Sequence, residues 1–279
     1  VFLVHCHLFQ MHLSSPAFVA FHLYLADTFS NLGRLDYASL SQQTLMEMVI
    51  EKIDNKDAIT NDEETHNDLQ EWAEITFKDE SFTEVRDIDW TDMQLEGTIA
   101  LEWLPLTVEN MSFEDNALNG TIDAEKLPKG LIKLNASNNA LSGEITLSKL
   151  PETMRELVLT KNRLEGSVDL ENLPPALNTL YLDLNAFVGT VCLAKLPESL
   201  EHLTLDDNTL YGTVDLTQLP DRMRELGLRA NGFEGETDFS KLPKTMWWFR
   251  VSDTKLTGEV RYGKRFRVEV SGVKMADKP

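Results

Sequence analysis

The sequence predicts an α/β repeat protein, a solenoid of stacked coils of 23 residues each. A proline recurs at this interval along the chain: Pro105, Pro128, Pro151, Pro174, Pro197, Pro220 and Pro243. A glycine recurs at the same interval: Gly97, Gly120, Gly143, Gly166, Gly189, Gly212, Gly235 and Gly258. An asparagine does so too: Asn116, Asn139, Asn162, Asn185, Asn208 and Asn231. Three residue types that repeat in phase without an insertion indicate coils that bury their apolar sides against their neighbours.

Within one coil, each repeated residue type has a physical role. Leu203 and Leu205 alternate with polar neighbours, as a strand with one buried face requires. Such strands would stack into a parallel sheet at roughly 4.8 Å spacing. The asparagine follows the strand, where its amide can satisfy backbone groups that lack a sheet partner. The glycine permits either a positive φ or close contact between coils, and the proline fixes φ at a turn. All three columns are therefore predicted to be structural.

The repeated pattern Leu-x-x-Leu-x-Leu-x-x-Asn-x-Leu-x-Gly-x-(Ile/Val) resembles that of leucine-rich repeats, and most closely the plant-type subclass. The resemblance covers residues 82–262, seven full units and one partial unit. It implies a parallel sheet on a concave face, a mostly irregular or short-strand convex side, and partner binding on the concave face. One departure concerns the residue after Ile/Val, which is usually Asp, Thr or Ala here, whereas the subclass has proline.

The two ends of the chain differ from the repeats. Residues 1–38 form an apolar leader, for which a signal-like segment, a short helix packed on the solenoid and a disordered leader all remain open. Residues 39–81 predict a helical, acidic N-terminal cap, with a helix over 39–56 that Ser41 or Thr44 would cap. The cap resembles the N-terminal cap of secreted proteins of the plant-type subclass. Phe77, however, stands where those proteins have a cysteine that forms the disulfide of the cap. Residues 263–279 predict a C-terminal cap with a short strand, and a tail.

Charge and cysteine content restrict the partners and the compartment. The net charge is −20, and an acidic chain is poorly suited to nucleic acid or anionic membranes. The two cysteines, Cys6 and Cys192, predict no disulfide framework, which favours a cytoplasmic location. The alternative is a secreted or surface-displayed recognition module, in which the sequons at Asn110, Asn119 and Asn135 could be used. The sequence predicts no membrane span, no cofactor and no metal site. It predicts that the protein is a monomer.

The predicted function is a non-catalytic scaffold that binds a protein or peptide on the concave face. The N-terminal half of that face is acidic, whereas the C-terminal half carries residue types common in binding hot spots. The predicted partner-binding residues are Tyr181, Asp183, His202, Asp206, Glu225, Arg229, Trp248 and Arg250. For Trp248 the sequence favours a role in the end cap over one in binding.

The sequence also contains features of two other functions, catalysis and ice binding. Asp183, Asp206 and Asp207 are neighbouring carboxylates that could act as acid and base or bind Ca²⁺. An open face without a pocket favours solvated acids instead, so no catalytic residue is predicted. An ice-binding surface would need an unbroken column of threonines. The corresponding column in this chain contains glutamates, which argues against ice binding. Its members are Thr98, Thr121, Glu144, Ser167, Thr190, Thr213, Glu236 and Glu259.

Overall fold

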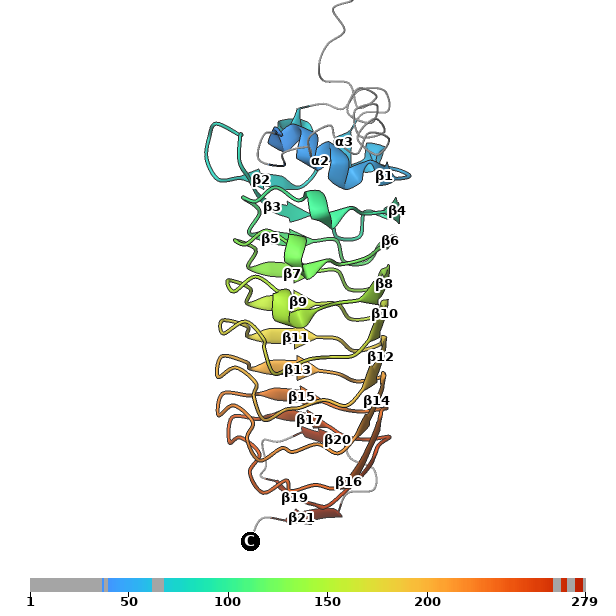
Figure 1. The fold of residues 1–279 in the computed structure, drawn as a ribbon, viewed down its shortest axis with the longest axis vertical. Helices are drawn as coiled ribbons and strands as arrows, with labels where there is room; N and C mark the ends of the chain where they lie inside the picture. Colours follow the sequence, from blue (N-terminus) through green and yellow to red (C-terminus); the bar gives the residue numbers. More distant parts are fainter. Residues whose placement is uncertain (1–36, 38–39, 62–67, 263–266, 270–273, 278–279) are drawn as a thin grey trace, which may run out of the picture.

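The computed structural model describes residues 37, 40–61, 68–262, 267–269 and 274–277, and these form one elongated stack of coils (Figure 1). The leader prediction for residues 1–38 therefore lies outside the described residues, apart from Tyr37. The boundaries of the four segments remain a prediction.

The N-terminal cap contains a shorter helix than predicted. Helix α2 (Gln42–Ile50) begins at Ser41, whose Oγ accepts a hydrogen bond from the Thr44 backbone N–H at 3.1 Å. It ends at Ile50 because strand β1 (Lys52–Ile53) pairs antiparallel with the first repeat strand of the second sheet. The rest of the cap is α3 (Asp57–Thr60), the 3₁₀ helix η2 (Leu69–Glu71) and β2 (Ile75–Phe77).

The first sheet is the predicted parallel sheet, with one short strand from each coil. Strand β2 pairs antiparallel with β3 at one edge, and β20 closes the other edge, as the predicted C-terminal strand. Within the predicted cap, residues 263–266, 270–273 and 278–279 lie outside the described residues. The strands are β3 (Val85–Asp89), β5 (Asn110–Ser112), β7 (Lys133–Asn135), β9 (Glu156–Val158), β11 (Thr179–Tyr181), β13 (His202–Thr204), β15 (Glu225–Gly227), β17 (Trp248–Arg250) and β20 (Arg267–Glu269).

The predicted short-strand side of each coil forms a second sheet, whose strands lie along the right edge in Figure 1. Its parallel strands are β4 (Glu96–Thr98), β6 (Ala117–Gly120), β8 (Ala140–Glu144), β10 (Arg163–Gly166), β12 (Ala186–Gly189), β14 (Thr209–Gly212), β16 (Gly232–Glu236) and β18 (Lys255–Thr257). The 3₁₀ helices η3 (Leu101–Trp103), η4 (Ala124–Lys126) and η5 (Leu147–Lys149) connect the two sheets in the early coils. Strands β19 (Glu259–Tyr262) and β21 (Lys274–Asp277) pair separately.

The glycine column occupies the second sheet, and both predicted reasons for glycine apply there. Every member has a positive φ, such as 102° at Gly97 and 145° at Gly258. A Cβ at Gly97 would also lie 2.4 Å from the Lys52 carbonyl oxygen, closer than any real side chain approaches. The positive φ therefore favours glycine throughout the column, and at Gly97 the close approach of the cap strand β1 requires it as well.

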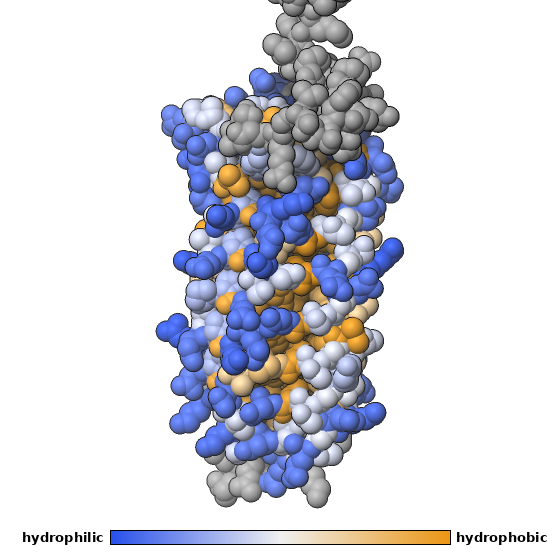
Figure 2. Space-filling view, viewed as in Figure 1, coloured by the Kyte–Doolittle hydropathy of each residue, from blue (hydrophilic) through white to orange (hydrophobic). Residues whose placement is uncertain are grey.

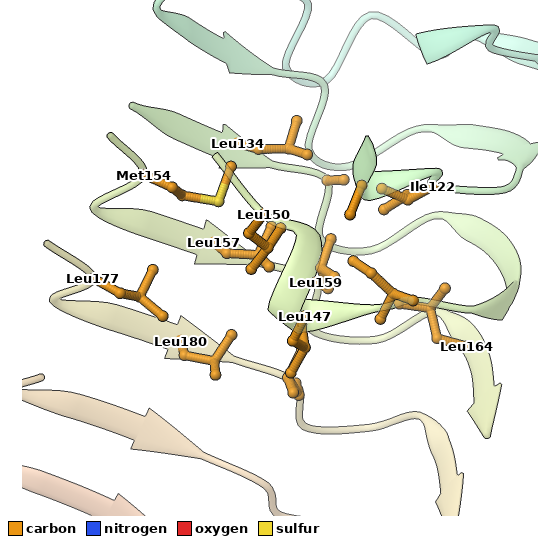
Figure 3. Close-up of a cluster of buried hydrophobic side chains, with 14 of the residues drawn as sticks. Ile122, Leu134, Leu147, Leu150, Met154, Leu157, Leu159, Leu164, Leu177 and Leu180 are labelled. Atoms are coloured by element: carbon orange, nitrogen blue, oxygen red, sulfur yellow. The ribbon is translucent and has the colours of Figure 1, made fainter. Parts of the chain in front are cut away.

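The core is a continuous column of aliphatic and aromatic side chains between the two sheets. Figure 3 shows Leu134, Leu157 and Leu180 from successive strands pointing to the same interior, where each is fully buried. Each such leucine contributes about 1.5–3 kcal/mol on burial, before the conformational entropy of ordering is subtracted. The apolar column explains why one coil cannot be stable without its neighbours.

The asparagine column forms a hydrogen-bonded ladder beside this core. Asn162 is representative: its Oδ1 accepts from the Leu141 N–H at 3.0 Å, and its Nδ2 donates to the carbonyls of Ala136 and Leu159 at 2.9 and 3.1 Å. Each amide therefore links its own coil to the preceding one. The same arrangement occurs at Asn116, Asn139, Asn185, Asn208 and Asn231.

The asparagine ladder stops where the repeat pattern breaks. Met93 has the asparagine phase in the first coil, and Asn55 of the cap hydrogen-bonds close to it. The Asn55 Nδ2 donates to the Gln94 carbonyl, and its Oδ1 accepts from the Glu96 N–H, both at 2.9 Å. At the other end, the Thr254 hydroxyl donates to the Val251 carbonyl of its own coil at 2.7 Å. Asn55 thus joins the cap to the first coil, whereas the Thr254 bond is local.

A band of apolar atoms follows the length of the molecule on the side that carries η3, η4 and η5 (Figure 2). Among the leucines that precede the repeated prolines, Leu150, Leu196 and Leu219 are 6%, 7% and 8% exposed. Leu173 and Leu242, at the same position of other coils, are only partly buried.

Candidate functional site

The predicted binding residues come together on the outward side of the first sheet. We call this surface the strand face: the outward residues of β9, β11, β13, β15 and β17, and the second residue after each strand. The strands are in register, so one row contains Thr179, His202, Glu225 and Trp248. The next row contains Tyr181, Thr204, Gly227 and Arg250. The third row follows the strand ends and contains Asp183, Asp206 and Arg229.

One polar cluster centres on Glu225 of β15. Its Oε2 accepts a hydrogen bond from the Tyr181 hydroxyl at 3.0 Å and lies 3.1 Å from His202 Nδ1. Tyr181 is on β11, so its side chain reaches past β13 to the glutamate. Burial raises the pKa of the Tyr181 phenol, and the negative charge of Glu225 raises it further. The phenol is therefore a proton donor throughout the physiological pH range.

A second cluster centres on Asp206. Its Oδ2 lies 2.6 Å from Arg250 Nη2, and its Oδ1 accepts from the Arg229 backbone N–H at 2.7 Å. The Arg250 guanidinium also lies 4.3 Å from the centre of the Trp248 ring, in cation–π geometry. Burial raises the pKa of Asp206 to about 6, which outweighs the opposite effects of Arg250 and the Arg229 N–H.

Gly227 makes this second cluster possible. It stands in a strand position where the neighbouring coils carry Thr204 and Arg250. A Cβ there would lie 2.6 Å from Asp206 Oδ1 and 2.7 Å from its Oδ2. The missing side chain leaves the space in which the carboxylate lies.

The remaining charged residues of the face have separate partners. Asp183 Oδ1 accepts from the Thr160 and Thr204 hydroxyls at 3.0 and 2.5 Å. Arg229 points away from the clusters: its guanidinium lies 3.4 Å from Asp253 and 3.8 Å from Asp207. The structure therefore brings seven of the eight predicted residues into two clusters and their border, and places the Arg229 side chain beside them.

One expectation about these residues is wrong. The sequence predicts Asp206 on an open, solvated face, but its side chain is 1% exposed, and the neighbouring Glu225 is also buried, at 4% exposed. Their neighbours cover them, since Tyr181 extends over β13 to Glu225 and Arg250 closes over Asp206. The pKa of Asp206 is correspondingly shifted, which an open face would not cause. The sequence signal for the burial of Asp206 is Gly227, a strand residue without a side chain.

Trp248 belongs to the strand face. Strand β17 pairs with β15 on one side and β20 on the other, so Trp248 is not on the last strand. Its ring also stacks on Trp247, with centroids 6.0 Å apart. The indole Nε1–H is buried without an acceptor among the described residues.

Among the residues that the structure describes, no three His, Cys, Asp or Glu side chains are grouped so that they could hold a metal ion. Within the described ranges, no helix has the length and hydrophobicity to cross a membrane.

Comparison with known proteins defines the fold. The sequence matches no protein-family model and no curated protein. Among solved structures, the crystal structure of a plant ice-binding protein is similar, with a TM-score of 0.52 and 20% identity over 79% of this chain and 81% of that one. The crystal structure of a TDR receptor is similar with a TM-score of 0.50 and 22% identity over 63% of this chain. The match spans only 32% of that receptor chain.

These similarities and the two stacked parallel sheets make the fold a leucine-rich-repeat solenoid of the plant type. The sequence resemblance is thus confirmed at the level of fold.

The Trp72–Phe77 segment forms the first edge of the stack, where Trp72 is buried and β2 pairs with β3.

Proposed function

We propose that the chain is a non-catalytic interaction module that binds a protein or peptide on the strand face. One observation carries this proposal: a single sheet places four of the predicted binding residues on the same face. They are Tyr181, His202, Trp248 and Arg250. Aromatic residues and arginine dominate the binding energy of protein interfaces. The sheet fixes their positions before a partner arrives, which lowers the entropic cost of binding.

A matched pair of substitutions tests the use of this face. Val158 lies on the strand face in β9 and is half-buried, whereas Val188 lies in β12 of the second sheet and is 45% exposed. Proteins or displayed peptides captured by the immobilised chain would be compared with those captured by Val158→Arg and Val188→Arg. We expect Val158→Arg to weaken capture at least about tenfold, because a bulky charge then stands in the interface. Capture that is equally strong with both variants would exclude the strand face.

The proposed location is the cytoplasm, with a secreted or surface-displayed module as the alternative. Cys192 is an exposed free thiol, which suits a reducing compartment. The fold similarity to a receptor structure favours the alternative. Of the three sequons, Asn119 is exposed on β6, whereas the amides of Asn110 and Asn135 donate to acidic side chains on the first sheet.

Asn119 therefore provides the sharpest test of location. Mass spectrometry of the protein from its native source would show a glycan on Asn119 if the chain enters the secretory pathway. An unmodified Asn119 together with a reduced Cys192 would support the cytoplasmic proposal.

Ice binding is not proposed, although one similar structure is an ice-binding protein. The column that would form a threonine face here is interrupted by Glu144, Glu236 and Glu259. Glu144 and Glu259 are exposed, so their charges break the flat surface that a regular threonine array would give.

A further inference from the structure

We propose that Arg250 covers the ring of Trp248 only while Asp206 is ionised, so that protonation of Asp206 releases the guanidinium and uncovers the ring. The proposal describes a pH-dependent change of the strand face, and its consequence for a partner rests on the proposed binding function.

Two contacts hold the Arg250 side chain in place. Its Nη2 lies 2.6 Å from Asp206 Oδ2, and its guanidinium lies over the Trp248 ring, 4.3 Å from the centroid. In the described part of the chain, Asp206 is the one carboxylate within 4.0 Å of this guanidinium. The Arg250 side chain is 19% exposed, so water compensates its charge only in part. The position of Arg250 therefore depends on the charge of a single residue.

Asp206 is fixed, whereas Arg250 can move. The Asp206 Oδ1 accepts from the Arg229 backbone N–H at 2.7 Å, and the carboxylate fills the space that Gly227 leaves. Arg250 stands next to Gly227 in register, so it reaches the carboxylate over a position without a side chain. An arginine side chain has many rotamers and loses much conformational freedom when it is held in one of them. When the pair breaks, the arginine is thus the part that leaves.

The groups around Asp206 set the pH range of the change. Burial raises its pKa to about 6, and the carboxylates of Asp183 in the preceding coil and Asp207 in its own coil act in the same direction. Arg250 on β17 and the Arg229 N–H in the following coil lower the pKa but do not outweigh burial. Asp206 is therefore mostly ionised at pH 7 and mostly protonated at pH 5.

Protonation removes the charge that holds the arginine. A guanidinium remains charged over this whole pH range. A cation that is mostly out of water beside a neutral carboxyl is unfavourable. The contact with the ring is weaker than a charge pair, and the side chain regains rotamer freedom when it extends into solvent. We therefore expect release of Arg250 below about pH 6.

Release changes what the strand face offers to a partner. In the paired state, Trp248 and Arg250 are both partly buried. The released state presents an uncovered indole ring and a cation without an internal counter-charge, two residue types that dominate binding energies. A peptide that places a carboxylate against Arg250 would therefore bind more tightly at pH 5 than at pH 7.

The experiment follows Arg250 directly, in the full chain labelled with ¹⁵N-arginine. NMR relaxation measures the order parameter of its Nε–Hε bond between pH 5 and pH 7, and Arg250→Lys assigns the signal. Asp206→Asn is the test variant, because it removes the ionisation. Asp207→Asn is the matched control, because it removes a neighbouring charge that pairs with Arg229 instead. Far-UV circular dichroism verifies that both variants fold.

We expect the order parameter of wild-type Arg250 to fall from about 0.8 at pH 7 to below about 0.6 at pH 5. The midpoint should lie near pH 6. Asp207→Asn should keep this transition, and Asp206→Asn should have the low value at both pH values. An order parameter that stays high in the wild type at pH 5, or in Asp206→Asn at pH 7, would overturn the proposal. Loss of the transition in Asp207→Asn would overturn it as well.

Failure here can be separated from failure of the proposed function. Capture that is lost with Val158→Arg, while Arg250 stays ordered at pH 5, would keep the strand face as the binding surface and remove the pH-dependent change. Release of Arg250 at pH 5, with capture unaffected by Val158→Arg, would keep the change and remove the binding role of this face.

Discussion

The buried carboxyl of Asp206 makes a specific prediction about stability and pH. It is 1% exposed, and burial raises its folded-state pKa from the ordinary value of 3.8 to about 6. In the folded protein the proton is therefore held more tightly than in the unfolded chain. The ionised form costs stability at neutral pH, and this cost disappears at low pH. Asp206→Asn removes the ionisation and preserves the acceptor that binds the Arg229 N–H.

The expected magnitude follows from the two pKa values. Below about pH 3 the carboxyl is protonated in both states, so wild type and Asp206→Asn should differ little. Between about pH 4 and pH 6 the wild type loses relative stability, at about 1.4 kcal/mol per pH unit. Above pH 6 the difference should reach a plateau of about 3 kcal/mol in favour of the variant. This value already includes the attraction of Arg250, since that arginine contributes to the pKa.

Urea denaturation, followed by far-UV circular dichroism at half-unit intervals from pH 4 to pH 7.5, measures the difference curve. Asp207→Asn is the matched control, because its side chain is 34% exposed and water screens its charge. That variant should change stability by less than about 0.5 kcal/mol at every pH. A flat curve for Asp206→Asn, or a variant that becomes progressively less stable toward pH 7, would refute the reasoning. The second result would mean that the pair with Arg250 outweighs burial.

Three further predictions concern single positions of the repeat. Gly227→Ala should lower the free energy of unfolding by about 1–3 kcal/mol, because the new Cβ displaces the Asp206 carboxylate. Urea denaturation measures this change, and a smaller loss in an Asp206→Ala background would verify that the two positions are coupled. Asn162→Ala should cost about 1–3 kcal/mol by leaving the Leu141 N–H buried and unpaired, and an unchanged melting midpoint would contradict the ladder. Leu184→Asn should stabilise by up to about 1 kcal/mol, because Leu184 is 45% exposed at a φ of 56° that asparagine tolerates better; a lower unfolding midpoint would oppose this.

The repeat made most of the architecture predictable from sequence. Periodic leucines specify a buried strand residue at each coil, and the phase of Asn162 or Gly97 repeats with them. Each coil packs against coils that have the same residue pattern, so one local pattern determines the whole stack. The helix end was less predictable, because β1 forms only when it pairs with β4 from a distant part of the sequence.

The sequence predicted which residues lie on the proposed binding face. It did not predict which of their side chains are buried or which contact one another. Register places Tyr181, His202 and Glu225 on one face, and the sequence numbering already contains that register. Their burial could not be read in the same way, because it depends on which side chains lean across neighbouring strands. Tyr181 crosses a strand to reach Glu225, and the repeat pattern contains no signal for that rotamer.

The sequence alone therefore determined the solenoid, its two repeating strand positions and its asparagine ladder, because these follow from a period that every coil shares. Only the tertiary structure decided which outward residues are buried, paired or available. Asp206 enters the space that Gly227 leaves and meets Arg250 from another coil, a combination of three non-repeating residues. Such contacts depend on distances between side chains of different coils, and periodicity does not contain them.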